Sequence, residues 1–305
     1  MRGFPGRSAG PLPRAAQRSP DAGRRLRMGR LYLVATPIGN LEDVTLRALR
    51  VLGEVDWVLA EDTRRTRVLL EQHGVRAQMK SLHAHNEASR VEAVLEALER
   101  GEEVALVSDA GTPLLSDPGQ RLVIAAVEAG HEVVSVPGAS APLAALSVAG
   151  LSADAFSFVG FLPRKAGARQ RRIEELRDRP ETLIFFESPQ RVGDTLALLA
   201  EEMGDRPACL ARELTKLHEE VVRGTLGELA QRFEVPPRGE ITLVVAGAPP
   251  PSPPSAQVVD RAIRERLAAG ASARDAASQV AASLGTPRSR VYARVLALRG
   301  DDPGT

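Results

Sequence analysis

The sequence predicts an α/β protein of two domains followed by a small helical module. Through residues 29–150, short apolar runs alternate with amphipathic stretches, which is the pattern of a parallel sheet covered by helices. Residues 151–247 have similar apolar runs but fewer helical crossovers, which indicates a mixed sheet. A proline-rich linker at residues 248–257 then precedes a helix-forming segment at 258–300.

Length and composition agree with this organisation. A chain of 305 residues holds two domains of about 100–200 residues each. Its hydrophobic content of 43% and charged content of 26% are typical of soluble globular proteins. The single cysteine, Cys209, excludes a disulfide framework and cysteine-based zinc sites. No apolar run reaches the about 18–20 residues of a membrane helix, so we expect a cytoplasmic protein without membrane contact.

Charge is distributed unevenly along the chain. Residues 1–28 contain seven Arg and one Asp, and residues 258–300 contain eight Arg and three acids. Since the net charge is +1, these segments of +6 and +5 leave −10 for the rest. We expect residues 1–28 to be a disordered basic arm, without the apolar region of a secretory signal. A polyanion would have to be bound locally, because the body is acidic.

The loop at residues 107–119 is the central candidate site of the first domain. Strands are expected at residues 31–35, 55–60, 103–107 and 132–136, and helices at 44–52, 120–130 and 143–149. The loop follows the third strand, and open α/β sheets bind ligands at such strand ends. It contains Asp109 and Asp117 but no P-loop or dinucleotide motif, which favours a neutral or cationic ligand. The alternative is a tight turn in which Asp caps a helix.

Two further charged stretches lie in this domain. The second strand runs into Glu61-Asp62-Thr63-Arg64-Arg65, which is either a charged helix start or part of a site. His83, His85 and Glu87 alternate and would share one face of an extended segment. No other histidine clusters with them, so we expect no metal site.

The second domain contains the one dense basic run of the acidic body. Strands are expected at residues 155–161, 182–186, 208–211, 221–225 and 239–247. One helix is expected after residue 191 and through residue 199, and another at residues 226–233. The basic run has no acid and comprises Arg164, Lys165, Arg169, Arg171 and Arg172. It is either a solvated helix start or a loop that grips phosphates.

The C-terminal segment has the pattern of a helix-turn-helix. Helices are expected at residues 258–269, 272–284 and 287–298, with Gly285-Thr286 as the turn. The last helix carries Arg288, Arg290 and Arg294. Three-helix bundles without nucleic-acid contacts share this pattern, so it does not decide the function alone.

Seven motifs occur along the chain in one order: residues 34–41 (VATPIGNL), 61–64 (EDTR), 85–87 (HNE), 108–113 (SDAGTP), 136–140 (VPGAS), 186–189 (FESP) and 212–216 (RELTK). Together they resemble the tetrapyrrole methylase fold family, and within it the bacterial enzymes that methylate a cytidine 2′-hydroxyl in the decoding region of 16S ribosomal RNA. The resemblance covers residues 29–247 and extends to the C-terminal module.

The resemblance implies S-adenosylmethionine as methyl donor, held in a crevice between the two α/β domains. Carried over to this sequence, its contacts are Pro37, Asp109, Ala110, Gly111, Thr112, Ser140, Ala141, Phe186, Glu187, Glu240 and Ile241. It also implies a homodimer that acts on the small ribosomal subunit. The first loop lacks the glycine-rich sequence of the tetrapyrrole enzymes, which disfavours a tetrapyrrole substrate.

Methyl transfer to a ribose hydroxyl needs a group that accepts its proton. The candidate bases are Glu61, Glu87 and Glu213, together with Lys216 if its pKa is depressed. The candidate RNA-binding residues are Arg64, Arg164, Lys165, Arg169 and Arg212. Two alternatives stay open: a small-molecule, tetrapyrrole-type methyltransferase, and a non-catalytic RNA-binding assembly factor that has kept the fold.

Overall fold

The computed structural model describes residues 28–83, 86–250 and 254–300. The expected basic arm up to residue 27, His85 and residues 251–253 of the linker lie outside the described residues. The chain divides into two compact units. The first runs to Ala144 and includes Glu213–Glu219, and the second comprises Ala145–Arg212 and the chain from Glu220 onward.

The first unit is built on a five-stranded sheet in which every pair is parallel. Its strands are β1 (Arg30–Val34), β2 (Trp57–Ala60), β3 (Met79–Ser81), β4 (Val104–Val107) and β5 (Glu132–Val136), in the order β3-β2-β4-β1-β5. The connections contain the short helix η1 (Leu41–Asp43) and the helices α1 (Leu46–Glu54), α2 (Thr63–Gln72), α3 (Glu87–Glu99) and α4 (Gln120–Glu128). The predicted parallel α/β sheet is therefore confirmed.

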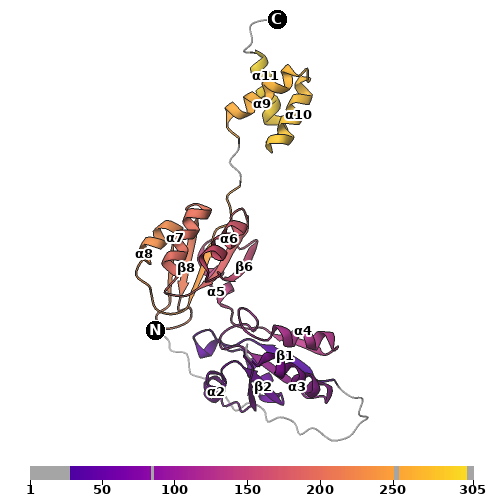
Figure 1. Ribbon diagram of the computed structural model, residues 1–305, viewed down its shortest axis with the longest axis vertical. Coiled ribbons are helices and arrows are strands. Elements are labelled where there is room, and N and C mark those ends of the chain that lie inside the picture. Colours follow the sequence, from indigo (N-terminus) through magenta and orange to yellow (C-terminus); the bar gives the residue numbers. More distant parts are fainter. Residues whose placement is uncertain (1–27, 84–85, 251–253, 301–305) are drawn as a thin grey trace, which may run out of the picture. The chain divides into compact units, whose positions relative to one another are not determined.

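Helices cover both faces of this sheet (Figure 1). Alternate strand residues point to opposite faces, so Tyr32 packs in the cluster that contains Leu52 of α1, whereas Leu31 packs with Leu98 of α3 and Leu122 of α4. Because both faces are buried at the centre of the sheet, β2 and β4 are continuously apolar.

Strand β3 and helix α3 are absent from the sequence-based prediction. The alternation of His83, His85 and Glu87 does not describe an extended face, because Glu87 is the first residue of α3. The side chain of Asn86 accepts a hydrogen bond from the His83 amide at 2.8 Å and donates to the Ser81 carbonyl at 3.2 Å. These bonds turn the chain from the three-residue β3 into the helix.

The second unit contains a mixed five-stranded sheet, as predicted. Its strands are β6 (Phe156–Phe161), β7 (Thr182–Glu187), β8 (Pro207–Arg212), β9 (Glu220–Thr225) and β10 (Ile241–Val245), in the order β6-β7-β10-β8-β9. Strands β6 and β7 are parallel, and the other pairs are antiparallel.

Three helices pack against this sheet: α6 (Ala166–Leu176), α7 (Val192–Met203) and α8 (Leu226–Arg232). Their shared core contains Ile173, Leu196 and Leu229 together with Phe185 and Leu210 of the sheet, all at most 1% exposed. Helix α5 (Ala141–Ala149) crosses the boundary between the two units.

The C-terminal module consists of α9 (Ala256–Ala268), α10 (Ala273–Leu284) and α11 (Arg288–Gly300). It has a core of its own, formed by Ile263, Ala277, Val280, Val291 and Val295, which are all fully buried. Gly285 ends α10 with a left-handed backbone (φ 58°). Among the described residues, no helix has the length and apolar composition needed to cross a membrane.

Candidate active site

Backbone contacts hold three loops together at the carboxyl end of the first sheet. The Thr36 amide donates to the Gly111 carbonyl at 2.9 Å, and the Gly111 amide donates back at 3.0 Å. Gly111 has a φ of 83°, and a Cβ there would lie 3.1 Å from Ile38 Cγ2. The Thr112 hydroxyl donates to the Ala139 carbonyl at 3.2 Å. The loops with the predicted cofactor residues Pro37, Asp109, Ala110, Gly111, Thr112, Ser140 and Ala141 are thus neighbours.

Acidic side chains lie beside this junction. Asp109 accepts a hydrogen bond from the Asp62 amide at 2.8 Å, and its carboxylate is 3.6 Å from the Arg65 guanidinium. Burial, reinforced by the charges of Glu61 and Asp109, raises the pKa of Asp117 to about 6. Burial, together with the charge of Asp109, also raises the pKa of Glu61. A cation that entered this region would relieve the repulsion between the carboxylates.

Arg64, a predicted RNA contact, lies at the start of α2. Its guanidinium donates to both carboxylate oxygens of Asp62, at 3.0 and 2.8 Å, and its side chain is 86% exposed. Hydrogen bonds from the Arg64 side chain and amide lower the pKa of Asp62 to about 2. Arg64 is therefore accessible, with its charge compensated by Asp62.

Glu87, a candidate base, contacts the start of α4. Its Oε1 accepts hydrogen bonds from the Gly119 amide at 3.1 Å and the Arg121 amide at 3.0 Å. A carboxylate at a helix N-terminus interacts favourably with its unpaired amides and dipole. This geometry gives Glu87 a capping role. Within the described part of the chain, no group of three or more His, Cys, Asp or Glu residues could hold a metal ion.

The other two candidate bases, Glu213 and Lys216, lie in the segment that joins the first unit. They form an ion pair in which Lys216 Nζ is 2.8 Å from Glu213 Oε1. The Thr215 hydroxyl accepts a hydrogen bond from the Asn40 amide at 3.0 Å. A Cβ on Gly39 would lie 2.5 Å from the Lys216 side chain, so the loop after β1 and this segment are in close contact. The predicted cofactor loop and this acid–base pair are therefore neighbours.

Left-handed backbone marks the same region. Among the described residues, the non-glycine residues with positive φ are Leu114 (75°), Ser116 (71°), Glu213 (52°) and Thr215 (65°). Such conformations cost about 1–3 kcal/mol each and cluster at functional sites. All four lie in the loop after β4 or in the 213–219 segment.

In the second unit, strand register brings further predicted residues to one edge of the sheet. Ile241, at the start of β10, lies opposite Glu187 at the end of β7 and opposite Arg212 at the end of β8. Phe186 lies beside Phe161, the last residue of β6. Glu240 directly precedes β10. The antiparallel pairing of β10 thus joins residues that are far apart in the sequence.

The Glu187 carboxylate points into the second unit, where the residue is 3% exposed. It accepts hydrogen bonds from the Thr195 hydroxyl and the Ser188 amide, both at 2.8 Å, and lies 3.3 Å from the Arg191 guanidinium. Arg191 in turn donates to the carbonyl of Leu162 at 3.1 Å. Glu187 therefore anchors Arg191, and Arg191 holds the backbone that leads into the basic run.

The basic run begins after this anchor and continues into α6. Arg164 and Lys165 are exposed, whereas Arg169 is partly buried. In the part of the chain that the structure describes, no carboxylate lies within 4.0 Å of the cationic groups of these three residues. The Nε of Arg169 is buried and has no hydrogen-bond partner among those residues. This loop is therefore a surface of uncompensated positive charge.

Arg212 differs from these cations because it is engaged within its own sheet. Its Nε lies 2.6 Å from Glu220 Oε2, and its Nη1 donates to the Arg238 carbonyl at 3.3 Å. Glu220 also pairs with Arg232 at 2.8 Å, and hydrogen bonds from both arginines, that of Arg212 first, lower the pKa of Glu220.

Two residues near the site were absent from the sequence-based prediction. Arg191 lies four residues after Glu187, a spacing that allows an ion pair within one turn. Phe161 lies three residues before Arg164, the first residue of the basic run; its side chain is 55% exposed, and its ring centroid is 5.5 Å from that of Phe186. Gly160, with a φ of 74°, forms a bulge that lets Phe158 and Phe161 contact the same ring. An exposed aromatic residue beside a basic run was the available signal.

The chain is similar to known proteins over most of its length. Residues 30–230 match the family model described as Tetrapyrrole (Corrin/Porphyrin) Methylases. The chain is 48% identical over 272 residues to a Mesorhizobium japonicum protein named ribosomal RNA small subunit methyltransferase I, covering 88% of this chain and 92% of that protein. A Micromonospora olivasterospora protein of the same name is 50% identical over 274 residues, which cover 88% and 86% of the two chains.

Solved structures show the same fold at lower identity. The methyltransferase CobJ superposes with a TM-score of 0.57 at 20% identity, covering 72% of this chain and 95% of that chain. A uroporphyrin-III C-methyltransferase from Thermus thermophilus, solved with S-adenosylhomocysteine, gives a TM-score of 0.54 at 21% identity and covers 72% and 97% of the two chains.

Proposed function

This chain belongs to the tetrapyrrole methylase family, in its ribosomal RNA small subunit methyltransferase I branch, and we propose that it methylates 16S ribosomal RNA with S-adenosylmethionine. The acceptor is the ribose 2′-oxygen of a cytidine in the decoding region, as the sequence motifs imply. The observation that carries the proposal is identity of 42–50% to proteins of that name over nearly the whole chain.

The first unit fits S-adenosylmethionine. Hydrogen bonds between Thr36 and Gly111 and between Thr112 and Ala139 bring three loops together at one end of the sheet, where a ligand can contact all three. The carboxyl groups of Glu61, Asp109 and Asp117 suit the sulfonium and ammonium charges. When bound, S-adenosylmethionine supplies a methyl group on a positively charged sulfur.

The family resemblance implies that Phe186, Glu187, Glu240 and Ile241 of the second unit also contact the cofactor. Glu187 takes part through its backbone, because its carboxylate is committed to Thr195 and Arg191. The crevice between the α/β domains that the resemblance implies stays a prediction.

The chain must hold the ribose hydroxyl in line and accept its proton, and a general base contributes about 10²–10⁴-fold. Glu61 is a suitable base because its raised pKa brings it nearer to neutrality. Glu213, supported by its ion pair with Lys216, is the second candidate. We place Glu87 outside this step, because its oxygen already caps α4.

RNA is held by the uncompensated loop of Arg164, Lys165 and Arg169, with Arg64 and Arg212 at other strand ends. Phosphate contacts of this kind position a substrate and weaken as salt rises. The family resemblance further supports a homodimer in the cytoplasm. Light scattering tests the dimer, and a monomer at working concentration would refute it.

The test is transfer of labelled methyl from S-adenosylmethionine to small ribosomal subunits from cells that lack this activity. We expect label in 16S ribosomal RNA with the wild type, and kcat reduced at least about 100-fold in Glu61→Gln or Glu213→Gln. Unlabelled RNA with the wild type would refute the function. Full rates in both variants would refute these bases.

A further inference from the structure

The C-terminal module presents a chemically distinct surface on α11. The three acids of the module lie on α9 and α10, and each of them has a partner within the module. Asp260 forms a bidentate pair with Arg294 at 2.6 Å, Glu265 pairs with Arg261 at 3.0 Å, and Asp275 accepts from the Ser272 hydroxyl at 2.6 Å. Helix α11 itself contains no acid.

One side of α11 combines cations with an exposed aromatic ring. Arg288 and Tyr292 are four residues apart and so share a face, and Leu296 continues it. Arg288, Ser289 and Tyr292, with Arg274 of α10, line a surface pocket of about 500 Å³. Tyr292 is 41% exposed, although aromatic rings usually bury their area in a core. We call this surface the tyrosine face.

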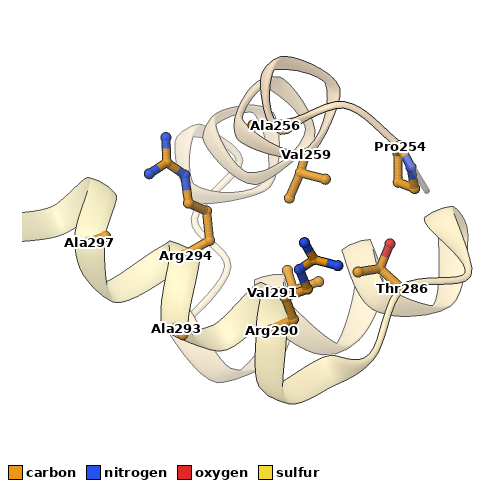
Figure 2. A pocket seen from close by; sticks show the side chains of 9 residues that line it. All are labelled: Pro254, Ala256, Val259, Thr286, Arg290, Val291, Ala293, Arg294 and Ala297. Carbon is orange, nitrogen blue, oxygen red and sulfur yellow. The ribbon is translucent and has the colours of Figure 1, made fainter.

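The other side of α11 differs in chemistry. Figure 2 shows Arg290, Arg294 and Ala297 along α11, with Val259 and Ala256 of α9 across a second pocket. Asp260 compensates the charge of Arg294. The hydrogen bonds that Arg294 donates lower the pKa of Asp260. Ala293 and Ala297 supply no ring on which a base could stack. This side therefore offers a cation in Arg290 but no aromatic platform.

The tyrosine face has the chemistry of a single-stranded RNA contact. Its two arginines, Arg274 and Arg288, have no carboxylate within 4.0 Å among the residues that the structure describes. An exposed ring between uncompensated cations can stack on an unpaired base while the arginines contact its phosphates. The pocket volume lies within the about 300–1,000 Å³ range of ligand sites. A protein interface would present more aromatic and apolar surface than Tyr292 and Leu296.

We propose that the pocket formed by Arg274, Arg288, Ser289 and Tyr292 binds one unstacked nucleotide of the substrate RNA. The ring of Tyr292 stacks on the base, and Arg274 and Arg288 contact the phosphates on either side of it. The identification of this RNA as 16S ribosomal RNA rests on the proposed function. The site holds the RNA through the helical module, separately from the residues that hold the cofactor.

The test compares Arg288→Ala and Tyr292→Leu with the matched control Arg290→Ala, which removes the same charge from the other side of the same helix. Binding of the full chain to protein-free 16S ribosomal RNA is measured across a salt series, and methyl transfer to small subunits is measured in parallel. Melting temperatures verify that each variant is folded. Tyr292→Phe retains the ring and serves as the rescue.

We expect Tyr292→Leu to weaken RNA binding about tenfold, and Tyr292→Phe to restore it. Arg288→Ala should reduce the slope of log affinity against log salt by about 0.7–0.9, as loss of one phosphate contact does. The KM for small subunits should rise in both Tyr292→Leu and Arg288→Ala, whereas kcat and the KM for S-adenosylmethionine should not change. The RNA affinity of Arg290→Ala should stay within about twofold of that of the wild type, because most surface substitutions have small effects.

Equal effects of Arg288→Ala and Arg290→Ala would overturn the site in favour of diffuse charge attraction. Weaker methylation of subunits with unchanged binding to protein-free RNA would overturn it in favour of a ribosomal protein partner. If the wild type methylates no subunit, the proposed function fails, while the direct binding comparison still decides the tyrosine face.

Discussion

Replacing Arg191 by Gln should separate the two roles that the structure gives to this residue. The guanidinium lies 3.3 Å from the buried Glu187 carboxylate, and it donates to the Leu162 carbonyl at 3.1 Å. The first contact stabilises the second unit, and the second holds the backbone before Arg164 and Lys165. Thr195→Val is the matched control, because it removes a hydrogen bond to Glu187 without touching the loop.

The sizes of the two effects follow from burial. Breaking a buried ion pair costs about 3–5 kcal/mol, and the hydrogen bonds that Glu187 keeps, with the 23% exposure of Arg191, reduce this to about 2–3 kcal/mol. Loss of the Thr195 bond to the carboxylate costs a comparable amount, about 1.5–3 kcal/mol. Both variants should therefore melt about 5–10 °C lower.

Of these two variants, only Arg191→Gln should weaken the binding of RNA. Releasing the loop lets two cationic side chains move, at about 0.5–1.5 kcal/mol each, so the KM for small subunits should rise about tenfold while Thr195→Val stays near wild type. Calorimetry and a methyl-transfer assay at saturating S-adenosylmethionine measure the two effects. Equal KM values in the two variants would refute the anchoring of the loop, and unchanged melting in both would refute the argument from burial.

Three further predictions concern other parts of the chain. Because the pKa of Asp117 is raised to about 6, its contribution to stability is present at pH 4 and is lost as the pH rises through 6. Asp117→Asn should remove this loss. If the melting temperatures of the two proteins change in parallel between pH 4 and pH 8, the prediction is contradicted. Glu87→Ala should lower the free energy of unfolding by about 1 kcal/mol through loss of the α4 cap, while Glu87→Gln retains an accepting oxygen and a normal kcat. A 100-fold lower kcat in a stable Glu87→Gln would instead identify Glu87 as a base. Deleting residues 250–305 should weaken RNA binding and leave S-adenosylmethionine binding intact, and unchanged RNA affinity would be the contrary result.

Most of the fold could be predicted because the central strands of each sheet are buried and therefore rich in apolar residues. The strand expected at residues 132–136 is β5 itself. Strand β3 was not assigned because it has only three half-buried residues, and α3 was hidden by the histidine alternation before it. The connection between them depends on side-chain bonds of Asn86, which no periodicity reveals.

The sequence indicates where the candidate site lies in the fold, but it does not indicate which partners its charged side chains contact. The loops after β1, β4 and β5 meet at one end of the sheet, as expected from the sequence, because these strands are parallel neighbours. The roles of single charges depend on partners distant in sequence. Glu187 turns inward because of Thr195 and Arg191, and Arg212 is bound by Glu220 on the neighbouring strand. Such pairings follow from register, which sequence spacing alone does not determine.

Nucleoside analysis of the labelled product determines whether this chain methylates a ribose oxygen of 16S ribosomal RNA. Small subunits from cells without the activity are incubated with labelled S-adenosylmethionine and the full chain, and the RNA is then digested with alkali and with nuclease. We predict label in one alkali-resistant dinucleotide that yields 2′-O-methylcytidine. Label on a base, or transfer to a small molecule with none in RNA, would contradict the account.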